Sequence, residues 1–417
     1  MMKFLKYLSA ALFLISAVAH AGSRLWNEIS LGHLAQARQL IESGADVNER
    51  NDLGAPILLH AVFDGDAELV KLMLSKGADV NAMGLHRTTA LHLANKKGMA
   101  AVLLAYGAKV DAATDNGETP LHWAAKRVNE LGRQVDSLEF ARVLIEHGAD
   151  VNKEAKSLMN ATPLNLAAAS NNIPVATLLL EHGANVLGGK EGVPALISAC
   201  ASPDSVEMVR LIVAHGGKIN GFSRHDFSPL MTAAHWGHLK IAEFLLSQGA
   251  DPNLANRVGF TPLYMAAGSD YNYATAEALI RHGANPNAVT IHGFTALHQA
   301  AARSIKVAGL LLANGADANI ADKHGDTALH EAVKYASREL DMVELLLKHG
   351  ANPNLRDSHE GVSPFHKALH TGDVSIVKLM LAYGADVSIT TRSGGSALSH
   401  ARESEAIKEL LRAHGAK

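Results

Sequence analysis

The chain has 417 residues, of which 48% are hydrophobic, 19% charged and only 5% aromatic, and its formal net charge is −3. This composition excludes a disordered chain, and the small negative charge without any basic run argues against a nucleic-acid partner. Frequent glycine with few aromatic residues favours thin, repeated packing layers over one large core.

Residues 1–21 are expected to be a secretory signal peptide. Lys3 and Lys6 give a positive start, an apolar run follows at 8–18, and small residues precede a cleavage point after Ala21. The run is too short for a stable membrane span, and an uncleaved anchor is the alternative interpretation. Cleavage would leave 36 basic and 41 acidic residues, a net charge of −5. The mature protein is then expected in the periplasm or outside the cell. No later stretch is apolar enough to span a membrane.

A glycine, usually within Gly-Ala-Asp or a close variant, returns every 30 to 41 residues along the rest of the chain. These glycines are Gly44, Gly77, Gly107, Gly148, Gly183, Gly216, Gly249, Gly283, Gly315, Gly350, Gly384 and Gly415. The 396 residues after position 21, divided by twelve, give a period of 33. A period of this length indicates a solenoid built from one supersecondary unit.

A second motif predicts where the first helix of each unit begins. It reads Thr-Pro-Leu-His at 119–122 and Thr-Ala-Leu-His at 89–92, 295–298 and 327–330. Thr or Ser caps free backbone N–H groups, and Pro fits the first helical turn, where its missing donor costs nothing. Pro56 and Pro194 mark two degenerate copies.

Apolar residues eight, five and four positions before the repeated glycine predict one face of a second helix. Leu69, Leu72 and Met73 stand in this relation to Gly77. The glycine then supplies a left-handed cap, which a residue with a β-carbon resists. The polar stretch that follows, such as residues 113–118, predicts a tight hairpin that leads to the next unit.

The sequence resembles the ankyrin repeat family. The resemblance rests on Thr-Pro-Leu-His-Trp-Ala-Ala at 119–125, on Gly-His-Leu at 32–34 and 237–239, and on Gly-Ala-Asp-Val-Asn at 44–48 and 77–81. It covers nearly all of residues 22–417. It implies an all-α ankyrin-repeat solenoid of about twelve helix-turn-helix units, with hairpin finger loops and a concave face made by fingers and first helices. It also implies the binding of other proteins without chemistry of its own.

The copies depart from the pattern at both ends and at two internal places. Residues 23–50 lack the Thr-Pro-Leu-His start and residues 389–417 stop soon after Gly415, so both are expected to be caps. The 41-residue interval places extra residues around 128–137, as either a contact site or a tolerated surface loop. The unit at 193–219 matches weakly and is expected to be a soft point or a bend.

The 23 histidines are assigned structural roles because eleven of them recur in register with the repeat. His92, His122, His298, His330 and His366 follow Leu or Phe in the first motif, and His147, His182, His215, His282, His349 and His414 precede a repeated glycine. The resemblance implies that the first group hydrogen-bonds neighbouring backbone. A histidine in the last turn also suits the negative end of a helix.

No catalytic residue, cofactor or metal is expected. The pairs His366/His370 and His235/His238 have spacings that metal ligands use, but no third ligand stands at motif spacing. Phosphate-binding, nucleophile-elbow and zinc-protease motifs are missing from the sequence. Cys200 is expected to be a small buried residue of a helix.

Candidate partner-binding residues occupy positions that the repeat leaves free, at finger tips and first-helix ends. They are Phe63, Arg87, Lys126, Trp236, Arg257, Phe260, Tyr271, Tyr273, Phe294, His324, Tyr335 and His370. Aromatic residues and Arg are what binding hot spots favour. Trp236 is the foremost candidate, because it falls in the variable pair before Gly237; the alternative is packing onto the next unit.

These features predict a secreted or periplasmic, bacterial, monomeric scaffold or adaptor that binds another protein through its concave face and fingers. A secreted effector that acts on host proteins is one alternative. An enzyme with an unrecognised site is another, and it predicts a non-repeating polar cluster that the sequence does not offer.

Overall fold

The computed structural model describes residues 24–94, 98–126, 137–156, 160–188, 194–203, 205–335, 340–401 and 404–417. The described residues fall into two compact units, one ending at Lys218 and the other beginning at Ile219. The expected signal peptide lies outside the described residues, as does nearly all of the expected insertion at 128–137.

The first unit contains six successive helix pairs among its described residues. Its helices are α2 (Arg24–Ser30), α3 (Leu34–Glu42), α4 (Ile57–Asp64), α5 (Ala67–Ser75), η1 (Leu85–Arg87), η2 (Ala90–Leu93), α6 (Met99–Ala105), α7 (Pro120–Ala125), α8 (Ser137–Glu146), α9 (Pro163–Ala169), α10 (Ile173–Glu181), α11 (Ala195–Cys200) and α12 (Val206–Ala214). The 3₁₀ helix η2 takes the place of an α-helix in the third pair. The prediction of an ordinary first helix at 89–92 is therefore wrong in detail, although Thr89 caps this short turn as expected.

The second unit contains six further pairs. Its helices are α13 (Pro229–Trp236), α14 (Leu239–Ser247), α15 (Pro262–Ala266), η3 (Asp270–Asn272), α16 (Tyr273–Arg281), α17 (Ala296–Ala301), α18 (Ile305–Ala313), α19 (Ala328–Tyr335), α20 (Leu340–Lys348), α21 (Pro364–Thr371), α22 (Val374–Ala382), α23 (Ala397–His400) and α24 (Glu405–Ala413).

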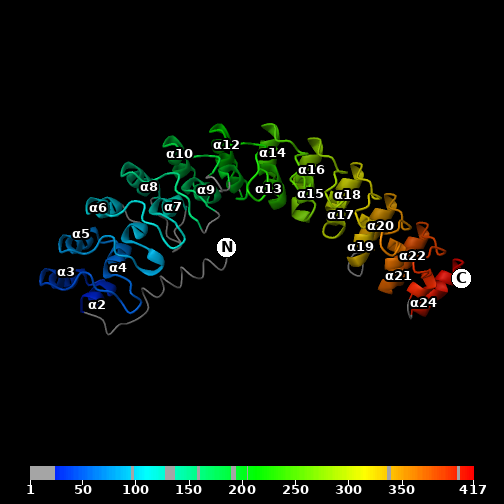
Figure 1. Cartoon of the computed structure of the whole chain (residues 1–417), viewed down its shortest axis with the longest axis horizontal. Helices are drawn as coiled ribbons and strands as arrows, with labels where there is room; N and C mark the ends of the chain where they lie inside the picture. The colour runs from blue at the N-terminus through cyan, green and yellow to red at the C-terminus, as the bar shows by residue number, and fades with distance from the viewer. Residues whose placement is uncertain are drawn as a thin grey trace. The chain divides into compact units, whose positions relative to one another are not determined.

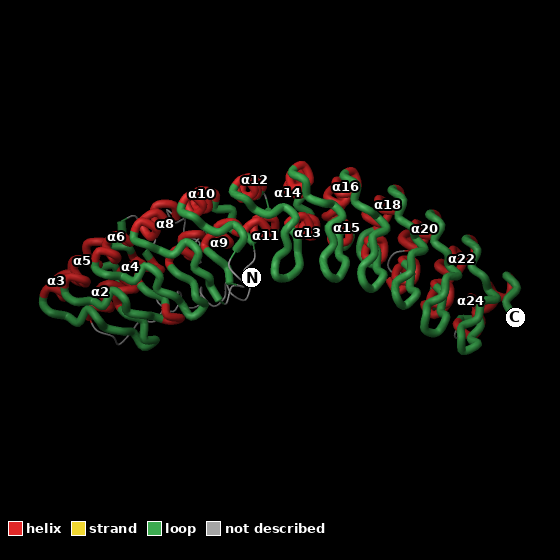
Figure 2. Tube along the Cα trace, turned by 45° about the horizontal axis from the view of Figure 1, so that its top comes forward, coloured by secondary structure: helices red, strands yellow, loops and turns green. Residues whose placement is uncertain are grey.

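Within each unit, the first helices of successive pairs pack on one another and the second helices form a parallel row (Figure 1). A finger loop runs from each second helix to the next first helix and projects beyond the helices (Figure 2). The described residues hold no named strand, only three isolated antiparallel bridges within fingers, at Arg50↔Pro56, Ala155↔Ala161 and Ala321↔Thr327. The predicted all-α solenoid of helix pairs with finger loops is confirmed in the part of the chain that the structure describes.

First helices begin where the capping motif predicts. Thr162 has an extended backbone, its hydroxyl accepts the N–H of Asn165, and Pro163 opens α9. At the two degenerate copies, Pro56 and Pro194 stand one position earlier, as the residue before the helix, with ψ of 142° and 140°. An extended proline can precede a helix but offers no side-chain oxygen to its free N–H groups.

Second helices end at the repeated glycine. All twelve of these glycines, from Gly44 to Gly415, have φ between 82° and 95°. In this left-handed region a β-carbon is strained, so the predicted cap is confirmed at every repeat.

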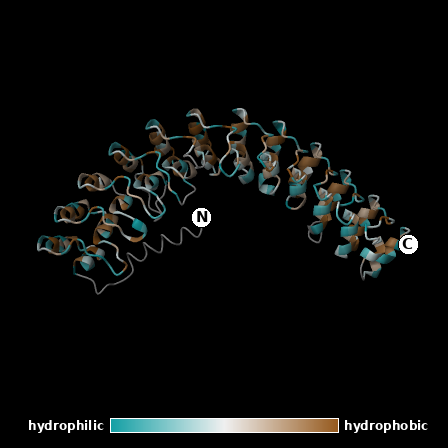
Figure 3. Ribbon diagram, viewed as in Figure 1, coloured by the Kyte–Doolittle hydropathy of each residue, from teal (hydrophilic) through white to brown (hydrophobic). Residues whose placement is uncertain are grey.

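The core lies between the two helices of each pair and between neighbouring pairs. Leu121 of the first motif is fully buried, as are Leu69, Val70 and Met73 of α5. Leu72, five residues before Gly77, is only half-buried, so the prediction that this position faces the core was wrong here. The buried stripe of α5 instead includes the residues eight, seven and four positions before the glycine. Such a stripe is the centre of a helix face. Figure 3 shows the apolar residues mostly on helices and polar ones along the turns and fingers.

A ladder of asparagine side chains links neighbouring pairs on the side of the turns after the second helices. Asn253 shows the pattern: its Nδ2 donates to the Gly283 carbonyl oxygen at 2.9 Å, and its Oδ1 accepts the Asn285 N–H at 2.7 Å. Asn287 repeats both bonds with Gly315 and Asp317. One amide side chain thus satisfies a donor and an acceptor of the next repeat.

Candidate functional site

The Leu-His histidines are struts between neighbouring repeats. The backbone N–H of Thr119 donates to His122 Nδ1 at 3.1 Å, so Nδ1 is an acceptor and the ring proton sits on Nε2. Nε2 lies 3.1 Å from the carbonyl oxygen of Ala161, in the finger of the next repeat. His92, His298, His330 and His366 make the same two kinds of bond. Both ring nitrogens are therefore already used.

These five histidines are held neutral. Burial lowers the pKa of His92 and of His330 to about 4, and it lowers the pKa of His122, His298 and His366 as well. A buried imidazole that is flanked by a backbone donor and a backbone acceptor resists a second proton. This arrangement stabilises the stack and leaves no ring nitrogen for catalysis.

The histidines before the repeated glycines close the second helices. In His147, Nδ1 lies 2.8 Å from the Val143 carbonyl oxygen, four residues earlier. His182, His215, His282, His349 and His414 repeat this contact. Each imidazole satisfies a carbonyl that the end of its helix leaves without an intrahelical partner.

The finger loops of the second unit are tied to one another near their tips. The N–H of Ile291 donates to Val258 O and the N–H of Lys323 to His292 O, both at 2.9 Å. Gly293 shows how closely the fingers pack, because a β-carbon there would lie 2.7 Å from the Cα of Asp322. Consecutive fingers thus form a regular, rigid row.

The structure divides the predicted partner-binding residues by exposure. Arg87, Trp236, Arg257, Tyr271, Tyr273, His324 and His370 are exposed, whereas Phe63, Lys126, Phe260 and Phe294 are half-buried. For Tyr335, the last residue of α19, the side chain lies outside the described part. Whether these residues bind a partner stays a prediction.

Three exposed aromatic side chains come from neighbouring repeats of the second unit. Trp236 ends α13 and is 58% exposed, while Tyr271 of η3 and Tyr273 of α16 are 94% and 37% exposed. Asn272 holds the two segments together, because its Nδ2 donates to the His235 carbonyl oxygen at 3.2 Å. We call Trp236, Tyr271 and Tyr273 the aromatic cluster.

The close approach at Gly237 explains how this cluster forms. A β-carbon on Gly237 would lie 2.5 Å from Asn272 Oδ1 and 3.3 Å from the Tyr271 carbonyl oxygen. The glycine after Trp236 therefore lets the backbone of the next repeat approach. The sequence placed Tyr271 and Tyr273 at the end of a first helix; instead α15 ends at Ala266, and Ser269 caps a separate 3₁₀ helix.

Two candidates predicted at finger tips lie farther in and brace the fingers. The ring of Phe260 stacks on Tyr264 with a centroid distance of 4.7 Å, and Phe294 meets His298 edge-on at 5.7 Å. Each aromatic ring stands one residue before a Thr cap and packs against the first helix that follows. Sequence reasoning missed this because it took the whole finger loop as free surface.

Lys126 has an internal partner. Its Nζ lies 2.8 Å from Oε1 of Glu118, whose side chain is only 2% exposed. The sequence had offered Lys126 as a partner-binding residue, at a position that the repeat leaves free. A buried carboxylate requires a paired cation, so the structure gives Lys126 that role.

The remaining chemical candidates do not assemble. His366 uses both ring nitrogens, and His370 Nδ1 faces the His366 carbonyl oxygen at 3.4 Å. Across the part of the chain that the structure describes, no three His, Cys, Asp or Glu residues are grouped as metal ligands would be. Cys200 is buried in α11, and burial raises the pKa of its thiol. No described helix has both the length and the apolar character to cross a bilayer.

Comparison with known proteins identifies the repeat. The model of the family "Ankyrin repeats (3 copies)" matches residues 25–113, 58–155, 96–188, 187–256, 230–322, 263–357 and 329–417. The crystal structure of the ankyrin repeat domain of Bcl-3, a member of the IκB family, is 26% identical and covers 60% of this chain and 98% of that one, with a TM-score of 0.46.

Curated relatives share only part of their length with the chain. An ankyrin repeat protein of fowlpox virus (strain NVSL) is 31% identical over 154 residues, covering 35% of this chain and 43% of that protein. The palmitoyltransferase ZDHHC17 of Homo sapiens is 30% identical over 194 residues, covering 37% of this chain and 29% of that protein. The chain thus spans less than half of either relative.

Ankyrin repeats typically form a scaffold for protein interactions and not an enzyme. The overlapping family matches run from residue 25 to residue 417. Because they cover nearly the whole sequence, the chain belongs to the ankyrin repeat family.

Proposed function

We propose that this protein is an exported bacterial scaffold that binds another protein through the first helices and fingers of its second unit. The observation that carries the proposal is the aromatic cluster, in which Trp236 and Tyr271 are 58% and 94% exposed on neighbouring repeats. A tyrosine with so little burial contributes almost nothing to the core, so its surface is available to a partner.

The cluster has the composition of a binding hot spot. Trp and Tyr supply large contact areas and lose little side-chain freedom, and they dominate measured hot spots. The surrounding stack is held by hydrogen bonds between repeats, so little backbone entropy is lost on binding. We expect the exported protein to act as a monomer, which light scattering after gel filtration would test.

Export is the second part of the proposal. It is supported by the positive start, the apolar run and the small residues that end at Ala21. Residues 1–21 fused to a reporter that is active only after export should direct it out of the cytoplasm of a bacterial host. Amino-terminal sequencing of the mature protein should begin at Gly22, and retention of residues 1–21 in the cytoplasm would contradict export.

The binding proposal is tested by affinity capture with matched variants. Immobilised protein from Gly22 onward is exposed to periplasmic extract, beside a variant with Trp236→Ala, Tyr271→Ala and Tyr273→Ala. A control carries Tyr106→Ala and Tyr383→Ala, which remove exposed aromatic rings at the ends of second helices.

A partner that the wild type and the control retain, and the cluster variant loses, supports the scaffold and its recognition face. We expect the cluster variant to bind that purified partner at least tenfold more weakly, by titration calorimetry. Equal retention by all three proteins would place the recognition face elsewhere. If the wild type retains nothing specific, the proposal that it binds a protein is wrong.

A further inference from the structure

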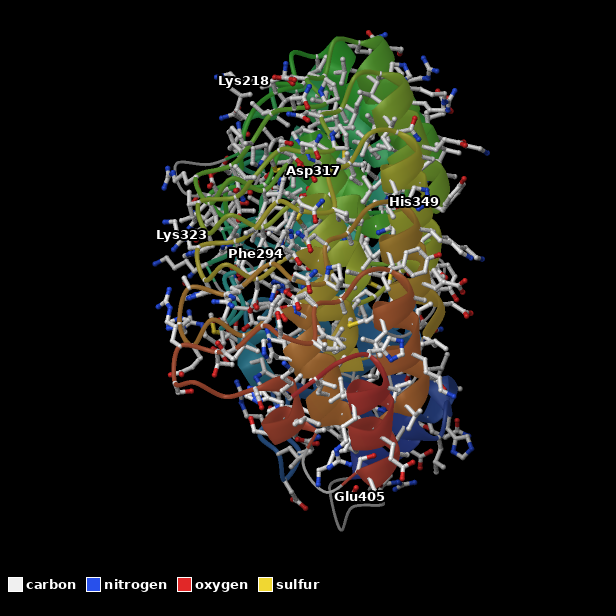
Figure 4. The ribbon with its side chains drawn as sticks, turned by 90° about the vertical axis from the view of Figure 1, so that its right-hand side faces the viewer. Lys218, Phe294, Asp317, Lys323, His349 and Glu405 are labelled. Atoms are coloured by element: carbon white, nitrogen blue, oxygen red, sulfur yellow. The ribbon has the colours of Figure 1, made fainter. Side chains whose placement is uncertain are left out.

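The outer ends of the second unit's fingers carry exposed basic side chains. We call this row the finger edge and define it by Arg257, His292, Lys323, His324, His359 and Arg392, all of which are exposed. They come from five consecutive fingers, those before α15, α17, α19, α21 and α23. Figure 4 shows Lys323 at the margin where the fingers project, farther out than Phe294, with His349 on the opposite side.

Three of these side chains, Arg257, Lys323 and Arg392, give the finger edge permanent positive charge, although the whole chain has a net charge of −3. Neither Lys323 nor Arg392 lies within ion-pairing distance of a carboxylate in the described residues, and Arg257, 90% exposed, meets Asp226 only at 3.8 Å. Arg392 instead donates to the carbonyl oxygens of Ser358 and His359, at 2.6 and 2.9 Å, which fixes its position and leaves its charge uncompensated.

Two aspartates in the same fingers face inward and do not cancel this charge at the surface. Asp322 Oδ1 accepts the backbone N–H groups of His324 and Asp326 at 2.8 and 2.9 Å. Asp357 Oδ1 accepts those of His359, Glu360, Gly361 and Val362. Their carboxylates organise the turns from which Lys323 and the stacked rings of His324 and His359 project. Glu360 is an exposed carboxylate of the same row.

The finger edge also has a fixed spacing. Backbone bonds join Val258 to Ile291 and His292 to Lys323 at 2.9 Å, and His324 to Ser358 at 2.6 Å. Because each finger is a hairpin two chain segments wide, neighbouring tips lie about 10 Å apart, roughly twice the spacing of paired strands. A polypeptide in the polyproline II conformation advances about 3.1 Å per residue and repeats every three residues, so about three of its residues span one finger and every third side chain points the same way.

We propose that the finger edge binds an acidic polypeptide segment in the polyproline II conformation, one that places a carboxylate at about every third residue. This inference rests on the proposed function and names the chemistry of the partner. A single-stranded nucleic acid is less suited, because the edge carries no Phe, Tyr or Trp on which bases could stack.

The proposal is tested by fluorescence anisotropy with a labelled peptide that carries Glu at every third position between Gly and Ser. The matching Gln peptide and a single-stranded oligothymidine of equal charge are the comparison ligands. The test variant is Arg257→Gln with Lys323→Gln and Arg392→Gln. The control is Lys240→Gln with Lys306→Gln and Lys378→Gln, which removes the same charge from exposed positions of second helices.

We expect the Glu peptide to bind the wild type and the control within twofold of each other, and the finger variant about tenfold more weakly. Lys323→Glu alone, at a side chain that makes no hydrogen bond or ion pair with the described residues, should also weaken binding without changing the circular dichroism spectrum of the protein. Equal loss in both triple variants, equal binding of the Gln peptide, or tighter binding of oligothymidine would each overturn the proposal.

The aromatic-cluster variant separates this inference from the proposed function. It should bind the Glu peptide as the wild type does. Each finger precedes the start of a first helix, whereas Trp236 is at the end of α13 and Tyr271 lies after the end of α15, so the substitutions do not touch the finger edge. A purified partner that needs the cluster, but binds the finger variant normally, would refute the inference and leave the scaffold intact. If the Glu peptide binds at the finger edge but no partner is captured, the proposed function of the aromatic cluster is refuted instead.

Discussion

His330 Nε2 lies 3.2 Å from the carbonyl oxygen of Val362, a residue 32 positions farther along the chain. The backbone N–H of Thr327 donates to Nδ1 of the same ring at 2.9 Å. One fully buried imidazole thus closes the start of its own helix and binds the finger of the next repeat. Loss of this ring removes a local and a long-range contact together.

We expect His330→Ala to lower the free energy of unfolding by about 2–4 kcal/mol, because it opens a cavity and leaves a buried N–H without its acceptor. Urea denaturation followed by circular dichroism measures the change. His292→Ala, at an exposed side chain, is the control and should change stability by less than about 0.5 kcal/mol. Similar effects of both variants would show that the strut contributes little.

The same histidines predict a loss of stability in mild acid. An unfolded histidine takes up its proton near pH 6.5, whereas His92 and His330 resist protonation until about pH 4. Between these values the unfolded state binds more protons, so the free energy of unfolding falls as the pH falls. The slope is about 1.4 kcal/mol per pH unit for each such histidine.

Urea denaturation midpoints, measured from about pH 7.5 down to about pH 4.5, test how stability depends on pH. Stability should be nearly constant above pH 7 and should decline below pH 6.5. His330→Gln, which cannot take up a proton, should reduce the slope. A curve that is flat down to pH 5 would contradict the prediction.

Two glycines with nearly the same positive φ separate backbone strain from steric crowding. Gly293 and Gly315 have φ of 85° and 84°, but a β-carbon on Gly293 would meet Asp322 Cα at 2.7 Å, while one on Gly315 would meet nothing within 4 Å. We expect Gly315→Ala to cost about 1 kcal/mol and Gly293→Ala at least about 2 kcal/mol. Urea denaturation measures the loss of stability of each variant. Equal losses would mean that the neighbouring finger moves aside without a loss of packing.

The pair of Lys126 and Glu118 predicts strong coupling. Lys126→Met leaves the Glu118 carboxylate buried without a cation and should cost about 3 kcal/mol. Adding Glu118→Gln removes that charge, so the double variant should be more stable than Lys126→Met alone. A double-mutant cycle by urea denaturation measures the coupling, and simple additivity would refute it.

The repeat architecture could be predicted from the sequence because its signals are local. Thr162 and Pro163 specify a helix start, and Gly283 specifies a helix end, through backbone preferences that act within a few residues. Their recurrence near 33 residues then defines the units. The structural role of the Leu-His histidines could be predicted too, since His122 and its relatives keep one place in every matching copy, but their lowered pKa values follow from burial that only the structure shows.

The details of the surface could not be predicted, because they depend on contacts between repeats. Nothing near Lys126 in sequence reveals that Glu118 turns inward to meet it. The stacking of Phe260 on Tyr264 likewise needs the actual path of the finger. Trp236 was expected to be exposed and is, but its proximity to Tyr271 follows from the fit of Gly237 against Asn272.

The asparagine ladder has an evolutionary consequence. Most described repeats offer the same two groups to their successor, as Asn253 offers an amide to Gly283 and Asn285, and Asn287 offers the same amide to Gly315 and Asp317. Asn185 departs from this pattern, because its Nδ2 donates to the Gly188 carbonyl oxygen of its own turn. A repeat that is duplicated or deleted whole therefore leaves matching donors and acceptors at the new junction. Such a chain can change its length in a single genetic event and keep its fold, while the surface of each copy diverges.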